Sequence, residues 1–325
     1  MLRQLRNLFL RFVVSTLSLV LLFYTVRGEL VEGLRHLTNV RFFPLLVALV
    51  INFVSLGVVT FRLGTILSVQ KIHLSFSRLY YLWTISLFFN LFLPSAVGGD
   101  IAKAYYIYKD SDKKMGSVTS VLIDRFFGMM ATISIGYFAY LFAHDQINDP
   151  KIGQILFWAV TVALIGVFFI MSQRFSKSAK LLLLKFSPDR FKGQLHRLFE
   201  ALELYRGRRE KFFVLYFYSL LAQALFIVMV YFLAKSINLD LPVAIFFLVM
   251  PLITVISMIP SIGGLGVREA ATVYLFREYI PLDQAVGLSI LFDLFLYGIG
   301  CACGILYAIR GGAPLRELEK IETES

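Results

Sequence analysis

The chain has 325 residues, of which 58% are hydrophobic, and its mean hydropathy is +0.75. A soluble protein needs a polar surface, so this composition excludes a soluble protein and predicts a membrane protein. The formal charge of +11 would suit a nucleic-acid-binding protein, but most of it lies in a few segments between apolar runs. There it is expected to fix the orientation of membrane helices, and no nucleic-acid partner is expected.

The apolar runs are continuous and mostly reach the roughly 20 residues that a helix needs to cross a bilayer. They predict an all-α polytopic membrane protein, with residues 1–325 forming a single integral-membrane domain. Hydropathy alone gives about eight apolar segments. Two of them, 80–102 and 243–280, are interrupted by proline and glycine, which leaves about six full spans. The predicted full spans, in chain order, are 8–26, 42–60, 117–143, 155–172, 212–234 and 283–309.

The charge of the segments between these spans predicts the topology, because segments rich in Lys and Arg stay in the cytoplasm. The segments predicted to be cytoplasmic are the N-terminus with Arg3 and Arg6, 61–79, 103–116 and 173–211. Segment 144–154 has two acids against one lysine and is predicted to lie outside. The tail, 310–325, has mixed charge and is expected to be cytoplasmic, like the N-terminus.

The basic segment 173–211 carries eleven Lys and Arg residues against four acids. After Ser187 it has Pro188 at a first helical position, followed by apolar residues on one helix face. This pattern predicts an amphipathic helix that either binds anionic lipid at the cytoplasmic face or packs against the underside of the helix bundle.

The two interrupted stretches read "LPSAVGGD" from Leu93 and "IPSIGGLGVRE" from Ile259. Proline removes a helix hydrogen bond and glycine lowers helix propensity, so both stretches are predicted to break. Both flanks of 80–102 are predicted to be cytoplasmic, so this stretch is expected to be a re-entrant hairpin; 243–280 is expected to enter from the opposite face. The residues predicted to break the helices are Pro94, Gly98, Gly99, Pro260, Gly263, Gly264 and Gly266.

A second similarity follows each break: "SVLIDRFF" begins at Ser120 and "SILFDLFL" at Ser289. Each half of the chain would then contain three transmembrane helices and one broken hairpin, the first repeat over 8–143 and the second over 155–309. The halves start on opposite sides of the membrane, which is the inverted repeat typical of transporters. The alternative is chance similarity among segments rich in Leu and Phe.

Charged residues within the apolar stretches are costly in a bilayer, so each is a candidate functional residue. The candidates for a substrate path are Asp100, Asp124, Arg125, Arg268, Glu269 and Asp293. Asp100 is in a position to cap the second helix of its hairpin, and Asp124 and Arg125 diverge on their helix and need other partners. Arg268 is the first predicted partner of Asp293 and Arg125 the second. The alternative is that these charges are structural pairs between helices.

No catalytic residue, metal site or cofactor is expected. The sequence has no nucleotide-binding, serine-hydrolase or zinc-protease motif, and its histidines are scattered. The "DSD" at Asp110–Asp112 resembles the metal-binding motif of sugar transferases, but neighbouring lysines favour a solvated loop. The chain is therefore not expected to be an enzyme.

Three stretches, "FFNLFLPSAVGGDIAKAYYIYK", "SVLIDRFFGMMA" and "MIPSIGGLGVREAA", together resemble the flippase-like family of the lysylphosphatidylglycerol synthase transmembrane region. The resemblance covers about residues 8–309. The family often has Gly after the motif proline, where this chain has Ser95 and Ser261. Full synthases that resemble this region continue into a soluble aminoacyl-transferase domain, which this chain is expected to lack, so lysyl transfer is not implied.

The resemblance and the two helix breaks lead to a functional expectation. The chain is expected to translocate a lipid or lipid-linked head group across the bacterial inner membrane, with phospholipid or a lipid-linked molecule as its substrate. The alternative is an integral-membrane enzyme of lipid modification, or a subunit associated with glycosyl or aminoacyl transfer. The sequence gives neither the cargo nor the oligomeric state.

Overall fold

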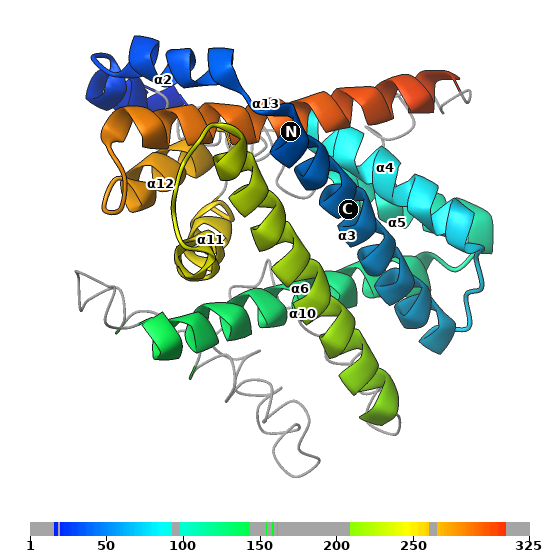
Figure 1. Cartoon of the computed structure of the whole chain (residues 1–325). Helices are drawn as coiled ribbons and strands as arrows, with labels where there is room; N and C mark the ends of the chain where they lie inside the picture. Colours follow the sequence, from blue (N-terminus) through cyan, green and yellow to red (C-terminus); the bar gives the residue numbers. More distant parts are fainter. Residues whose placement is uncertain are drawn as a thin grey trace. The chain divides into compact units, whose positions relative to one another are not determined.

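The computed structural model describes residues 16–18, 20–92, 98–143, 154, 158, 161, 209–259 and 265–309. Within these ranges every regular element is a helix, which confirms the all-α prediction there (Figure 1). The helices are α2 (Leu30–His36), η1 (Leu37–Asn39), α3 (Phe42–Val69), α4 (Phe76–Phe92), α5 (Gly98–Ser111), α6 (Lys114–Ala143), α10 (Arg209–Ser236), α11 (Val243–Ile256), α12 (Val267–Phe276) and α13 (Leu282–Ile309).

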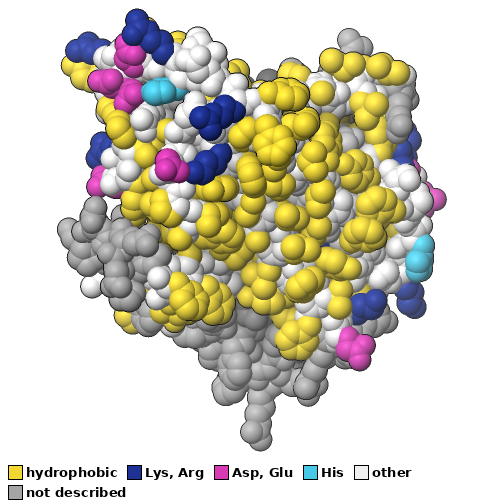
Figure 2. All heavy atoms as spheres, in the orientation of Figure 1, with side chains coloured by type: hydrophobic (Ala, Val, Ile, Leu, Met, Phe, Trp, Pro, Cys, Tyr) yellow, Lys and Arg dark blue, Asp and Glu magenta, His cyan; other side chains and the backbone are white. Residues whose placement is uncertain are grey.

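Four of these helices, α3, α6, α10 and α13, are long and apolar enough to cross a membrane. Helix α6 has 30 residues and the other three have 28 each. Large apolar side chains such as Phe42, Phe142 and Phe217 are exposed on them, and Figure 2 shows hydrophobic side chains over much of the face that it draws. A surface of this kind suits contact with lipid, so the chain is an integral membrane protein.

These helices correspond to the predicted spans 42–60, 117–143, 212–234 and 283–309. The predicted span 8–26 lies partly outside the described residues. Apart from a few residues, the span 155–172, the basic segment 173–211 and the tail 310–325 lie outside them as well.

The chain divides into two compact units, and several helices contribute to both. The first unit comprises Met1–Val54, Tyr80–Lys103 and Leu225–Ser325. The second unit comprises Ser55–Leu79 and Ala104–Ala224. The two units do not coincide with the predicted halves, 8–143 and 155–309.

Aromatic and small residues form the packing of the first unit. The ring of Phe246 on α11 lies 5.2 Å from that of Phe276 on α12 and 5.6 Å from that of Tyr231 on α10. Helix α2 packs closely on α13 (Figure 1), because a Cβ atom added to Gly33 would lie only 2.8 Å from a methyl group of Val286.

The core of the second unit forms where α3, α6 and α10 pack together. Its buried members are Ile66, Val69, Ile123, Phe127, Met130, Phe212 and Leu215. The Phe127 and Phe212 rings lie 5.0 Å apart. Apolar side chains along one face of each helix therefore build this core.

The first broken stretch folds as a helical hairpin of α4, with 17 residues, and α5, with 14. In the first unit, the Gly99 backbone N–H donates to Asn90 Oδ1 at 2.8 Å, and Lys103 Nζ lies 3.2 Å from the centre of the Trp83 ring. Gly99 contacts Asn90, whereas Lys103, later in α5, contacts Trp83, earlier in α4; the two helices are therefore antiparallel. At about 25 Å and 21 Å, each is shorter than the roughly 30 Å hydrocarbon core.

The two flanks of this hairpin lie next to each other in the second unit. Arg78 near the start of α4 bonds to Asp110 near the end of α5, with an Nε–Oδ2 distance of 2.7 Å. Just beyond the hairpin, Lys113 Nζ donates to the backbone oxygen of Lys71 at 2.8 Å. The chain therefore leaves α5 beside the point where it entered α4.

The second broken stretch also forms two short packed helices, α11 with 14 residues and α12 with 10. Phe246 near the start of α11 meets Phe276 at the end of α12, as an antiparallel pair requires. Gly266, directly before α12, has φ of 82°, a conformation that favours glycine. Of the predicted helix breaks, Pro94, Pro260, Gly263 and Gly264 lie outside the described residues.

The structure corrects two predicted segment boundaries. Helix α3 continues to Val69, so Arg62 is a helical residue and only 5% exposed, although 61–79 was predicted to be a cytoplasmic segment. Helix α5 continues to Ser111, so Lys103 is helical and 0% exposed, although 103–116 was predicted to be such a segment. Both cations are buried because they pair with acidic side chains inside the protein, and a hydropathy profile does not show such pairs.

Candidate functional site

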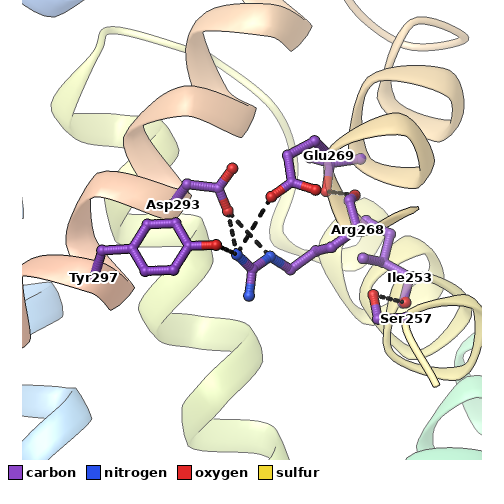
Figure 3. Close-up of polar contacts among 7 residues, drawn as sticks. Ile253, Ser257, Arg268, Glu269, Asp293 and Tyr297 are labelled. Atoms are coloured by element: carbon purple, nitrogen blue, oxygen red, sulfur yellow. Dashed lines mark hydrogen bonds and ion pairs between the residues drawn. The ribbon is translucent and has the colours of Figure 1, made fainter. Parts of the chain in front are cut away.

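The best-defined polar cluster in the described chain joins the second hairpin to the long helix α13 (Figure 3). Arg268 on α12 donates to Asp293 Oδ1 from Nη2 at 2.5 Å and from Nε at 3.0 Å. The same Nη2 lies 3.5 Å from Glu269 Oε1 and 3.4 Å from the hydroxyl oxygen of Tyr297. The prediction that Arg268 pairs with Asp293 is confirmed.

The cluster is shielded from solvent. The side chains of Arg268, Asp293 and Glu269 are 16%, 15% and 9% exposed. The guanidinium carbon also lies 5.5 Å from the centre of the Phe292 ring, within the range of a cation–π contact. Burial strengthens charge–charge interactions and makes an unpaired charge costly.

The local sequence explains why these side chains meet. Asp293 is eleven residues into α13, about 17 Å from the start of a helix about 42 Å long. Gly266 starts the short α12, so that Arg268 and Glu269 lie in its first turn. The positive end of the helix dipole favours an acid such as Glu269 at this position.

A second buried charge pair lies inside the first hairpin. Lys103 Nζ is 3.2 Å from Asp100 Oδ1, and the Lys103 side chain is 0% exposed. Asp100 was predicted to be a helix cap, and it lies in the first turn of α5, where the Gly99 N–H donates to Asn90 Oδ1. Lys103, Trp83 and Asn90 were not predicted as site residues.

The signal for Lys103 was present in the sequence. Each break contains a Gly-Gly pair that is followed by a basic residue at the same spacing. Lys103 is five residues after Gly98, and Arg268 is five residues after Gly263. Aligning the two breaks would therefore have identified Lys103 as the counterpart of Arg268.

A third buried pair lies in the second unit. Arg62 Nε donates to Asp124 Oδ1 at 2.7 Å, and its Nη1 donates to Ser219 Oγ at 3.1 Å. The side chains of Arg62 and Asp124 are 7% and 3% exposed. Asp124 was predicted near the start of a span, but it is ten residues into α6, and its neighbour Arg125 is half-buried.

The described residues contain no group of three or more His, Cys, Asp or Glu side chains that could hold a metal ion. Asp110 of the "DSD" stretch bonds instead to Arg78, and Asp112 is exposed. The chemistry that the described sites offer is the binding of charge within an apolar helical protein.

These features define a class: polytopic helical membrane proteins that bury charged residues on broken helices. A family model described as the lysylphosphatidylglycerol synthase TM region matches residues 8–304. The chain therefore belongs to that family, as its motifs predicted. No curated protein matches the chain.

Proposed function

We propose that the chain translocates a lipid or a lipid-linked head group across the membrane in which it lies. The observation that carries this proposal is the Arg268–Asp293–Glu269 cluster, placed where a short broken helix meets the middle of α13. A charged residue at mid-bilayer costs about 2.5–3.5 kcal/mol on insertion scales, so such residues commonly mark substrate or ion pathways. A polar lipid head group needs a path of this kind to cross the hydrocarbon region.

The two hairpins support the same proposal. In it, α4–α5 and α11–α12 are re-entrant hairpins of an inverted repeat that enter from opposite faces, and their broken ends provide polar backbone groups within the membrane. The adjacent flanks of α4–α5, joined by Lys113 and Lys71, fit a stretch that enters and leaves on one side. The membrane is the bacterial inner membrane, with both termini in the cytoplasm and anionic lipid at that face.

The test is lipid exposure in proteoliposomes of phosphatidylethanolamine and phosphatidylglycerol that contain NBD-labelled phosphatidylglycerol. Dithionite added outside bleaches only the outer leaflet, so inner-leaflet label bleaches only if it is translocated. We expect the chain to expose inner-leaflet label, and Asp293→Asn to slow this at least about tenfold, equivalent to about 1.4 kcal/mol. The matched control is Asp110→Asn, the same change in a partly exposed pair, which should keep the rate.

The family name favours a second candidate, a role in lipid modification. In that case the chain would be an integral-membrane enzyme, or a subunit that serves glycosyl or aminoacyl transfer. Protein-dependent modification of lipid, with inner-leaflet label still protected, would favour this candidate over translocation.

A further inference from the structure

The cluster on α12 and α13 has an imbalance of charge. Two carboxylates, Asp293 and Glu269, face one guanidinium, that of Arg268. Both reach the same nitrogen, Nη2, at 2.5 Å and 3.5 Å, so their contacting oxygens are at most about 6 Å apart. If both acids were ionised, the buried cluster would carry a net charge of about −1.

Glu269 contributes a second, independent observation. Its side chain is 9% exposed, and its Oε2 is buried without a hydrogen-bond partner among the described residues. A buried carboxylate oxygen that accepts no hydrogen bond is costly, whereas a protonated oxygen is neutral and can donate. Figure 3 shows Glu269 and Asp293 approaching the guanidinium from two different helices.

Other ionisable groups on the neighbouring helices do not restore the balance. Helix α11 carries no ionisable side chain. In α2, in residues 225–236 of α10 and in the described chain from α12 to α13, the charged groups outside the cluster bind one another: Arg35 with Glu32, His36 with Asp283, Lys235 with Asp240, and Arg277 with Glu278. Tyr297 contributes a phenol, which is neutral at neutral pH in its ordinary state.

We propose that Glu269 and Asp293 share one exchangeable proton, and that its binding and release are coupled to lipid translocation. Hydronium gives the proton to a carboxylate oxygen and leaves as water; release to water on the other side reverses the step. The coupling rests on the proposed function, while the proton site rests on the cluster alone. Arg268 with one ionised and one protonated acid makes a neutral buried group, which the membrane interior favours.

The proton site is tested by infrared spectroscopy of the purified full chain at about pH 7, where exposed Asp and Glu are ionised. We expect a carboxylic-acid C=O band in the wild type. Glu269→Gln and Asp293→Asn should each abolish it, because Arg268 then faces a single carboxylate. Asp110→Asn is the control and should keep the band, because Asp110 pairs one-to-one with Arg78 outside the cluster and is partly exposed.

Absence of the band in the wild type, or its persistence in either folded single variant, overturns the proton site. The wild-type spectrum decides this even if a variant fails to fold.

Coupling is tested with the NBD-phosphatidylglycerol vesicles under an imposed pH gradient. We expect the gradient to change the wild-type translocation rate at least about threefold and to have no effect on Glu269→Gln. Dependence on a sodium gradient in place of the pH gradient overturns the coupling. If the wild type translocates lipid but shows no infrared band, the proton site is rejected and the proposed function stands. If it shows the band but does not translocate the probe, translocation of this probe and its coupling to the proton are rejected.

Discussion

At the scale of single residues, the three buried ion pairs differ in how far the sequence could predict them. Arg268 was predicted for Asp293 because its hairpin directly precedes α13. The partner of Asp124 is Arg62, which is 62 positions away in the chain and comes together with it only through the packing of α3 on α6. No local sequence pattern indicates such a pair. An arginine at the end of an apolar run is instead predicted to lie in a loop outside the membrane.

Asp124→Asn should strongly destabilise the protein. It leaves Arg62 buried and without its counter-charge, and breaking a buried pair costs about 3–5 kcal/mol. The matched control is Asp110→Asn, because the Arg78–Asp110 pair is 36% and 21% exposed and such pairs contribute about 0–1 kcal/mol. Thermal unfolding of the detergent-purified variants measures the difference, and equal stability of the two would show that burial of the first pair does not matter.

The Arg268–Asp293 pair allows a test of structural against functional roles. Arg268→Asp combined with Asp293→Arg keeps both charges and reverses their order. If the pair only holds α12 to α13, the swap should recover much of the thermal stability lost in Asp293→Asn and restore translocation with it. We expect recovered stability with translocation still impaired, because a path for a head group depends on which helix carries which charge.

At the scale of elements, hydropathy located the apolar parts of the helices but not their ends. Helix α3 extends nine residues beyond the predicted end at residue 60, and α5 nine residues beyond residue 102. In both cases the sequence becomes more polar while the helix continues, because Arg62 and Lys103 form ion pairs with buried acids inside the protein. The described helices end at Phe92 and Ile256 and begin again at Gly98 and Val267, on either side of the stretches where breaks were predicted.

The close approach of α4 and α5 gives a prediction for glycine. A Cβ atom on Gly99 would lie 2.1 Å from the backbone oxygen of Ser86, which cannot move away without displacing α4. Gly99→Ala should therefore lower the unfolding temperature or prevent folding. Gly57→Ala on α3 meets nothing within 4 Å and should be neutral or stabilising by up to about 1 kcal/mol, since alanine favours the helix. Similar unfolding temperatures for both variants would contradict the close packing.

At the scale of the whole molecule, the membrane topology was predicted from loop charge, and two of the charges counted, Arg62 and Lys103, are buried inside the protein. The remaining basic residues of those segments still include Lys71, Arg78 and Lys113. The inverted repeat depends on this topology, because it requires α4–α5 to return to the side from which it started.

Cysteine labelling tests that topology in a background with Cys301 and Cys303 replaced by alanine. His73→Cys and Lys114→Cys, at exposed positions on the two flanks of α4–α5, should both react with an impermeant thiol reagent only from the cytoplasmic side. Asp240→Cys, after α10, has a 96% exposed side chain and should react only from the opposite side. Labelling of positions 73 and 114 from different sides would mean that α4–α5 crosses the membrane completely.

The length of the long helices has a consequence for the lipid around the protein. At 28–30 residues, α3, α6, α10 and α13 are about 42–45 Å long, some 12–15 Å more than a typical hydrocarbon core. The excess is about the thickness of the two headgroup regions, since a whole bilayer measures about 40–45 Å. The ends of these helices are therefore expected to lie among the lipid headgroups. Shortening the acyl chains would force the helices to tilt, so stability in vesicles should fall as the acyl chains become shorter.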